Sequence, residues 1–181
     1  RVARLHLAIV VLMGAGGSSM TIVEHTITAR DGATLSLRGP AREPDAGQPI
    51  MLCLHGRTWS TGPVFECPGC EALPELHARG VSAYTLDFRG FGRTPVAANA
   101  PRDGPHPLLL PSTCARDVVD ALLWLHARRA AAQGGGRAGA RARAERPISL
   151  LGWSYGGLVA QLVAADPSVA RVVAPDPAGG G

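Results

Sequence analysis

The chain has 181 residues, 18 basic and 14 acidic side chains, and a formal net charge of +4. This length is enough for one domain with a buried core. Every basic residue is arginine. Apart from a cluster at 137–146, the arginines are scattered and are not interleaved with aromatic side chains, so the sequence excludes an obvious nucleic-acid-binding surface.

Residues 1–19 have a basic start, an apolar run at 7–13 and small residues after it. This pattern is similar to a weak signal peptide. A non-native leader is an equally good interpretation, because Met20 opens a segment typical of a domain start. We therefore expect a cytoplasmic protein, with export as the alternative if residues 1–19 are a signal. The apolar run is too short to span a membrane.

A dinucleotide-binding turn can be excluded in the same region. The glycines at 14, 16 and 17 lack the third glycine of Gly-x-Gly-x-x-Gly, because Ser19 stands at its position. A helix should follow such a turn. The β-branched residues at 21–28 predict a strand instead.

The following segments predict a sheet with helices on it. Asp31-Gly32 is a strong hairpin signal between strands at 21–28 and 33–38. The nearly continuous apolar run at 49–54 predicts a strand covered on both faces. Periodicity and capping signals then predict the elements that follow: helix 71–79 ending at Gly80, strand 81–86, helix 114–129 capped by Ser112 or Thr113, flexible insertion 130–146, strand 148–151, and strand 169–174.

The four cysteines do not form a secreted disulfide pattern. Cys53 lies in an apolar strand and Cys114 at a helix start, which favours reduced, buried thiols. Cys67 and Cys70 form a Cys-x-x-Cys that could be a redox pair or half of a zinc site. No second cysteine pair follows and His77 is a lone candidate, so two incidental thiols are favoured. We expect no metal and no cofactor.

The segment at 147–165 carries the main chemical signal. An apolar run meets Gly-Trp-Ser-Tyr-Gly-Gly at 152–157 and passes into apolar residues at helical spacing, which predicts strand, sharp turn and helix. Such a turn strains its central residue and needs near-absent side chains at Gly152 and Gly156. It would expose the Ser154 hydroxyl at a helix N-terminus, where N–H groups favour negative charge. The alternative is an ordinary glycine-rich loop with a buried serine.

Two upstream segments add to this signal. Leu-Cys-Leu-His-Gly-Arg occupies 52–57, and Asp-Phe-Arg-Gly-Phe-Gly-Arg-Thr occupies 87–94. Together with Gly-Trp-Ser-Tyr-Gly at 152–156, they resemble the oxyanion loop, the Asp-x-Arg-Gly turn and the nucleophile elbow of the α/β-hydrolase family. The resemblance runs from about 21 to about 175. It implies a three-layer α/β sandwich with a mostly parallel sheet.

The resemblance also implies roles for individual residues. Ser154 would be the nucleophile, and the backbone N–H groups of Arg57 and Tyr155 would hold the oxyanion. The turn at 87–94 would brace the edge of the sheet rather than act in chemistry. His55 is expected to have a structural hydrogen-bonding role, with a role as base as the alternative. Trp59 and Phe65 would line the pocket or pack its loop.

The family's triad order is serine, then acid, then histidine, but all six histidines of this chain precede Ser154. We therefore expect the N-terminal portion of such a domain, at 20–181, without the last strands and the triad histidine. Asp176 is a candidate for the acid, with a simple turn residue as the favoured alternative, and His106 would substitute for the base only if its loop reached over the strand edges.

The predicted function is a serine hydrolase that acts on a carboxylic ester or similar small acyl substrate. Acyltransferase, peptidase and cofactor-free haloperoxidase activities use the same serine and remain open. Serine in place of aspartate at the elbow disfavours haloalkane dehalogenase and epoxide hydrolase chemistry. A non-catalytic acyl-binding module and an inactive fragment are the alternatives outside catalysis.

Overall fold

The computed structural model describes residues 21–45, 47–57, 60, 64–69, 71–94, 110–132 and 148–166. Within these ranges the chain forms five strands and three helices. The strands are β1 (Ile22–Thr28), β2 (Thr34–Pro40), β3 (Ile50–Leu54), β4 (Ser82–Asp87) and β5 (Ile148–Gly152). The helices are α2 (Ala72–Ala78), α3 (Pro111–Ala132) and α5 (Tyr155–Ala165). The predicted strands within these ranges are confirmed, each to within two residues at either end.

The strands form one sheet in the order β1-β2-β4-β3-β5. β3 pairs in parallel with β4 and with β5, whereas β2 is antiparallel to β1 and to β4. Among the described strands, β2 therefore runs against the other four, which confirms a mostly parallel sheet opened by a hairpin. Leu54 lies opposite Leu86 on one side and Gly152 on the other. The carboxyl ends of β3, β4 and β5 thus meet at one edge.

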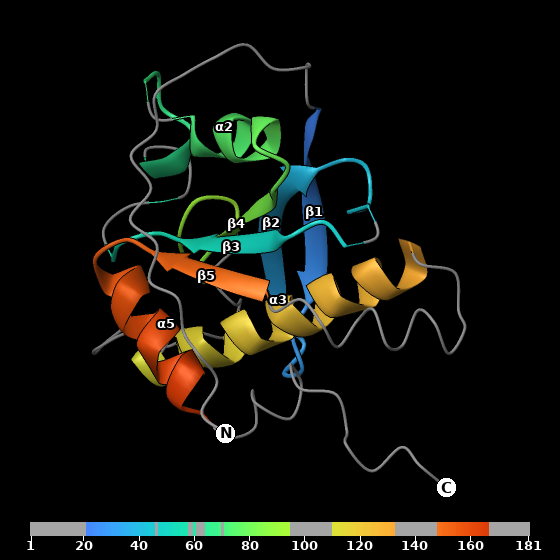
Figure 1. The fold of residues 1–181 in the computed structure, drawn as a ribbon. Helices are drawn as coiled ribbons and strands as arrows, with labels where there is room; N and C mark the ends of the chain where they lie inside the picture. Colours follow the sequence, from blue (N-terminus) through green and yellow to red (C-terminus); the bar gives the residue numbers. More distant parts are fainter. Residues whose placement is uncertain are drawn as a thin grey trace, which may run out of the picture.

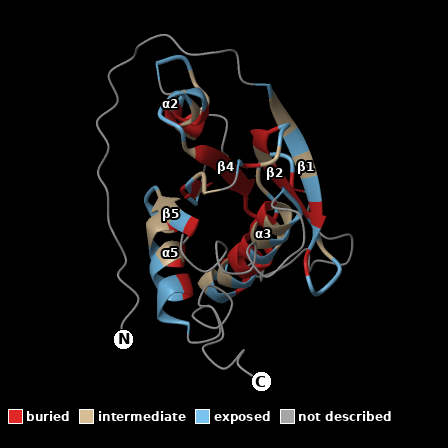
Figure 2. Cartoon of the chain, turned by 45° about the vertical axis from the view of Figure 1, so that its right-hand side comes forward, coloured by how far each residue is buried: buried red, intermediate tan, exposed pale blue. Residues whose placement is uncertain are grey.

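Helices cover both faces of this sheet, so the domain has three layers. α2 lies on one face, and α3 and α5 lie on the other (Figure 1). The core is concentrated in the strands and along α3 (Figure 2). Under α2, a small cluster includes Cys53, Phe65, Leu73, Leu76 and Ala83, while the larger cluster lies between the sheet and the other two helices.

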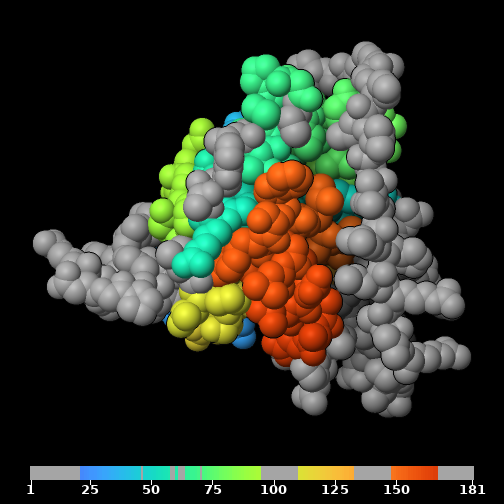
Figure 3. Space-filling model, turned by 90° about the vertical axis from the view of Figure 1, so that its left-hand side faces the viewer, coloured from blue at the N-terminus to red at the C-terminus, as the bar shows by residue number. Residues whose placement is uncertain are grey.

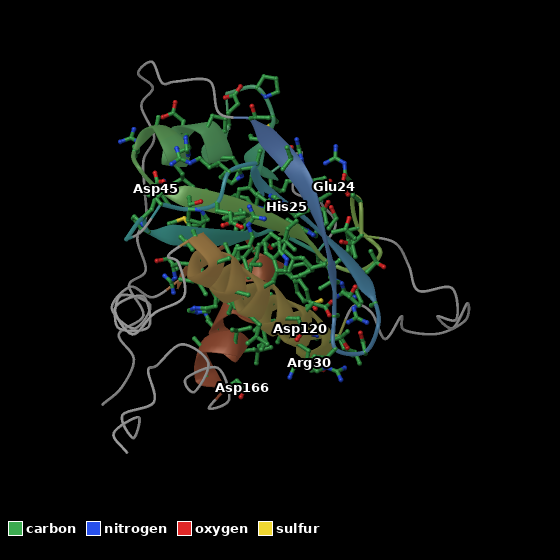
Figure 4. All side chains as sticks on the ribbon, turned by 90° about the vertical axis from the view of Figure 1, so that its right-hand side faces the viewer. Glu24, His25, Arg30, Asp45, Asp120 and Asp166 are labelled. Carbon is green, nitrogen blue, oxygen red and sulfur yellow. The ribbon has the colours of Figure 1, made fainter. Side chains whose placement is uncertain are left out.

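The β1–β2 hairpin turns where the sequence predicts it. Gly32 has φ 85°, a conformation that a residue without Cβ adopts at little cost. The Asp31 carboxylate accepts a hydrogen bond from the Ala33 N–H at 3.2 Å. Next to this turn, Arg30 Nε donates to Asp120 of α3 at 2.6 Å (Figure 4). The hairpin is therefore tied to the helix layer as well as to the sheet.

α3 is longer than predicted at both ends. It begins at Pro111 rather than at Cys114, and the Thr113 and Cys114 N–H groups donate to the Leu110 carbonyl. The predicted cap at Ser112 or Thr113 is wrong, because proline suits the first helical position and both residues already lie in the first turn. The predicted insertion at 130–146 is also too long, since the helix continues to Ala132. Residues 133–146 lie outside the described ranges.

α5 leaves part of its apolar surface exposed. Of the four apolar positions that predict this helix, Val159 and Val163 are buried against the core, whereas Leu158 and Leu162 are 46% and 41% exposed. β5 and α5, coloured orange to red, lie at the surface in Figure 3. The predicted leader at 1–19 and the predicted strand at 169–174 fall outside the described ranges. None of the described helices combines the length and hydropathy that a membrane crossing requires.

Candidate active site

The turn between β5 and α5 has the strained geometry that the sequence predicts. Ser154 has φ 52° and ψ −116°, and among the described residues no other non-glycine residue has a positive φ. A Cβ at Gly152 would lie 2.5 Å from the Gly156 carbonyl carbon. A Cβ at Gly156 would clash with the Leu54 carbonyl oxygen. Both glycines are therefore required by close approach of backbone to backbone.

Backbone hydrogen bonds hold this turn against the end of β3. The Trp153 N–H donates to the Leu54 carbonyl at 2.9 Å. Within the turn, the Gly156 N–H donates to the Trp153 carbonyl and the Gly157 N–H to the Ser154 carbonyl, both at 2.9 Å. The serine is thus fixed by main-chain contacts at the N-terminus of α5, where helix N–H groups favour an anion.

The loop after β3 lies directly beside Ser154. A Cβ built on Gly56 would be 3.4 Å from the Ser154 Cβ and 3.2 Å from Trp153 Cδ1. The structure therefore brings together the two segments in which the sequence places Ser154, Arg57 and Tyr155. Arg57 directly follows Gly56 and is exposed, and Tyr155 is the first residue of α5.

The Tyr155 side chain has a packing role, because it contacts α3 and Phe88. Its hydroxyl donates to Cys114 Sγ at 3.8 Å, and its ring meets Phe88 edge-on, with ring centroids 6.0 Å apart. Burial raises the pKa of the Tyr155 hydroxyl well above its usual value, and burial raises the pKa of the Cys114 thiol to about 11. Both groups remain protonated near neutral pH, so this contact joins α5 to α3.

Of the other three cysteines, Cys53 and Cys67 lie within the described ranges and differ in their surroundings. Cys53 is fully buried in β3, and burial raises its pKa to about 12, as expected for an inert core thiol. Cys67 is partly exposed, but Cys70, its predicted neighbour in the Cys-x-x-Cys, lies outside the described ranges. Within those ranges no group of three or more His, Cys, Asp or Glu side chains is arranged to hold a metal ion.

His55 has the structural hydrogen bonds that the sequence predicts. Its ring is fully buried, and both ring nitrogens bond to backbone groups, one to the Gly56 carbonyl and the other to the Phe88 N–H. A ring engaged in this way has no nitrogen left for a substrate proton. The alternative of a base at His55 therefore has no support in this geometry. His106, the other histidine considered as a base, lies outside the described ranges.

The turn after β4 braces the sheet, as expected. The Asp87 carboxylate accepts a hydrogen bond from the Arg93 N–H at 3.0 Å. Thr94 Oγ1 donates to the Asp87 carbonyl at 2.6 Å and accepts from the Ser36 N–H of β2 at 2.9 Å. The carboxylate therefore orders the turn, and the threonine joins the turn to β2.

Two features of the structure were not identified from the sequence. Trp153 is 60% exposed beside the serine, whereas the sequence analysis expected Trp59 and Phe65 either to line the pocket or to pack its loop. Phe65 instead packs in the core under α2, and Trp59 lies outside the described ranges. The second feature is the buried pair of Arg89 with Asp117 of α3. The exposed position of Trp153 could have been inferred from its place in the sequence, between Gly152 and Ser154.

The structure places a glycine-flanked serine on a strand-to-helix turn at the carboxyl edge of a three-layer α/β sandwich. This arrangement is typical of hydrolases in which such a serine is the nucleophile. The model of the alpha/beta hydrolase family matches residues 51–181, and the chain belongs to this family. No curated protein matches the chain.

Solved structures share the fold. An esterase from Pyrococcus furiosus aligns with a TM-score of 0.51 and 17% identity over 81% of this chain and 49% of the esterase. Brefeldin A esterase, a bacterial homologue of human hormone-sensitive lipase, aligns with a TM-score of 0.54 and 18% identity over 92% of this chain and 41% of that one. At these identities the likeness shows the fold alone. The chain spans about half the length of these structures.

Proposed function

We propose that this protein is a serine hydrolase for a carboxylic ester or similar small acyl substrate, with Ser154 as the nucleophile. One observation carries the proposal. Ser154 is held in a strained conformation at the start of α5, and Gly56 of the neighbouring loop lies directly against it. Strain of this kind persists only where the surrounding structure imposes it, and it concentrates at functional sites. Both named structural relatives are esterases, which supports the substrate class.

The proposed chemistry follows from this placement. Ser154 Oγ attacks the carbonyl carbon of the substrate, and the carbonyl oxygen takes up the negative charge. The backbone N–H groups of Arg57 and Tyr155 are the proposed donors to this oxyanion. Each donor of this kind contributes about 3–4 kcal/mol to transition-state stabilisation. Because the donors are backbone groups, the Arg57 guanidinium and the Tyr155 hydroxyl are not needed.

A serine nucleophile also needs a base to accept its proton. His55 is not assigned this role, because the Gly56 carbonyl and the Phe88 N–H occupy its two ring nitrogens. The proposed site therefore combines the Ser154 nucleophile and the two backbone oxyanion donors with a base other than His55.

The test is reaction of the purified protein with a fluorophosphonate, followed by mass spectrometry to locate the adduct. We expect the adduct on Ser154 and none in the Ser154→Ala protein. Ser149→Ala is the matched control, because it removes an exposed serine hydroxyl from the same strand. Folded wild-type protein without an adduct would contradict the proposal. Equal binding of an acyl ligand by wild type and Ser154→Ala, with turnover by neither, would then favour the acyl-binding module.

A further inference from the structure

The hydrogen bonds of His55 fix its protonation state. The Phe88 N–H donates to Nε2 at 2.9 Å, so Nε2 carries a lone pair and not a proton. Nδ1 lies 2.6 Å from the Gly56 carbonyl oxygen and must therefore carry the ring proton that this oxygen accepts. The ring is the neutral tautomer protonated at Nδ1.

The surroundings of His55 favour this neutral state. The ring is fully buried and packs against Phe88 and Phe91, with ring centroids 4.6 Å and 5.4 Å away. Burial lowers the pKa of His55, although the Gly56 carbonyl and the Asp87 carboxylate oppose this effect. Packed against two aromatic rings and hydrogen-bonded at both nitrogens, the imidazole is a fixed strut between the end of β4 and the loop after β3.

This strut acts on one particular peptide group. The carbonyl of Gly56 and the N–H of Arg57 belong to the same peptide unit, which is planar and trans, so the two bonds point in opposite directions. A hydrogen bond that fixes the Gly56 oxygen therefore fixes the direction of the Arg57 N–H. Gly56 lies beside Ser154, with 3.4 Å between a Cβ at position 56 and the Ser154 Cβ. The bond from His55 thus controls a donor next to the serine.

We propose that His55 is a positioning residue: the hydrogen bond from its Nδ1–H to the Gly56 carbonyl orients the Arg57 N–H toward the oxyanion. This inference rests on the proposed function, since it assigns the Arg57 N–H to the same site. It differs from a purely structural role for His55, because it depends on the donor at Nδ1 and not on the acceptor at Nε2.

Two substitutions separate these nitrogens. In His55→Asn the side-chain N–H₂ takes the place of Nδ1 and can donate to the Gly56 carbonyl. In His55→Gln the side-chain oxygen takes the place of Nε2 and can accept from the Phe88 N–H, while the donor to Gly56 is lost. A structural role predicts similar losses in both proteins. A positioning role predicts that the asparagine variant is rescued.

The first readout is the kinetics of fluorophosphonate labelling, separated into the dissociation constant of the probe and the rate constant of the covalent step. We expect His55→Gln to slow the covalent step about 100-fold, as for loss of one oxyanion donor. His55→Asn should stay within about threefold of wild type, and probe dissociation constants should change little. Equal slowing in both variants, or no slowing in His55→Gln, would overturn the inference.

The second readout does not depend on reaction. In ¹⁵N-resolved NMR spectra, the Arg57 amide signal should move in His55→Gln and stay near its wild-type position in His55→Asn. If wild type is not labelled at Ser154, the proposed function fails, yet this readout still decides whether His55 orients the Arg57 amide. An Arg57 signal that moves in neither variant, or equally in both, would refute the orienting role.

A measurement on wild type covers the case in which either variant does not fold. The ¹⁵N chemical shifts of the imidazole ring distinguish a protonated from an unprotonated nitrogen. We expect His55 to be protonated at Nδ1 and unprotonated at Nε2. Protonation at Nε2 would leave the Gly56 carbonyl without its donor and would overturn the inference directly.

Discussion

Arg89 and Asp117 form a buried ion pair that joins the turn after β4 to α3. Arg89 is 7% exposed and Asp117 is fully buried. Arg89 Nε lies 2.8 Å and 3.0 Å from the two carboxylate oxygens of Asp117. Arg89 Nη1 also donates to Asp31 of the hairpin at 2.6 Å. The hydrogen bonds with Asp117 raise the pKa of Arg89, so the guanidinium stays charged and holds three segments together.

Removal of the buried Asp117 carboxylate should destabilise the folded protein. We expect Asp117→Ala to lower the free energy of unfolding by about 3–5 kcal/mol, because it leaves a buried charge with one partner fewer. Asp31→Ala is the matched control: its carboxylate is half exposed and should contribute less than about 1 kcal/mol. Urea denaturation of both variants measures the difference. Equal losses would show that the buried carboxylate has no special role.

Much of the fold was predictable, because local rules agree with the tertiary structure. Asp31-Gly32 suits a hairpin, and continuous apolar runs suit strands buried on both faces. The geometry at Ser154 was also predictable, since Gly152 and Gly156 leave room that only a tight turn requires. In each case the signal lies within a few neighbouring residues.

The rest depends on contacts between distant residues. Arg89 and Asp117 are 28 positions apart, and no local pattern indicates that they pair. Leu158 and Val159 are adjacent and apolar, yet one is exposed and the other buried, because burial depends on which face of α5 meets α3 and the sheet. The residues of the site and of the core could therefore be predicted from sequence only where a local backbone conformation determines them.

The close approach at Gly156 gives a second prediction. Gly156→Ala should lower the free energy of unfolding by more than about 3 kcal/mol, because the new methyl would meet the backbone of Leu54 and His55. Gly157→Ala is the neighbouring control. Its Cβ would lie 3.5 Å from the nearest atom, the Gly152 carbonyl oxygen, and alanine is favoured over glycine in helices by about 1 kcal/mol. Thermal melts should therefore show opposite shifts, and parallel shifts would argue against the observed packing.

The strain at Ser154 gives a third prediction. Ser154→Gly and Ser154→Ala both lack the hydroxyl, but only glycine adopts φ 52° at little cost. We expect Ser154→Gly to be more stable than Ser154→Ala by about 1 kcal/mol. In the exposed helical position Ala164, replacement by glycine should instead cost about 1 kcal/mol. Chemical denaturation tests both pairs, and the same sign at both positions would contradict strain at the serine.

His126 on α3 makes stability depend on pH. Burial lowers its pKa to about 4, and its Nδ1 lies 3.0 Å from Arg129 Nη2. An unfolded histidine has a pKa near 6.5, so between about pH 6.5 and pH 4 the unfolded chain binds a proton that the folded chain does not. The free energy of unfolding should therefore fall as the pH falls through this window.

Urea midpoints at several pH values measure the slope. His126→Gln should reduce the slope by up to one proton, while the lowered pKa values of His25 and His55 maintain the remainder. A His126→Gln profile parallel to wild type would assign the whole dependence to other groups.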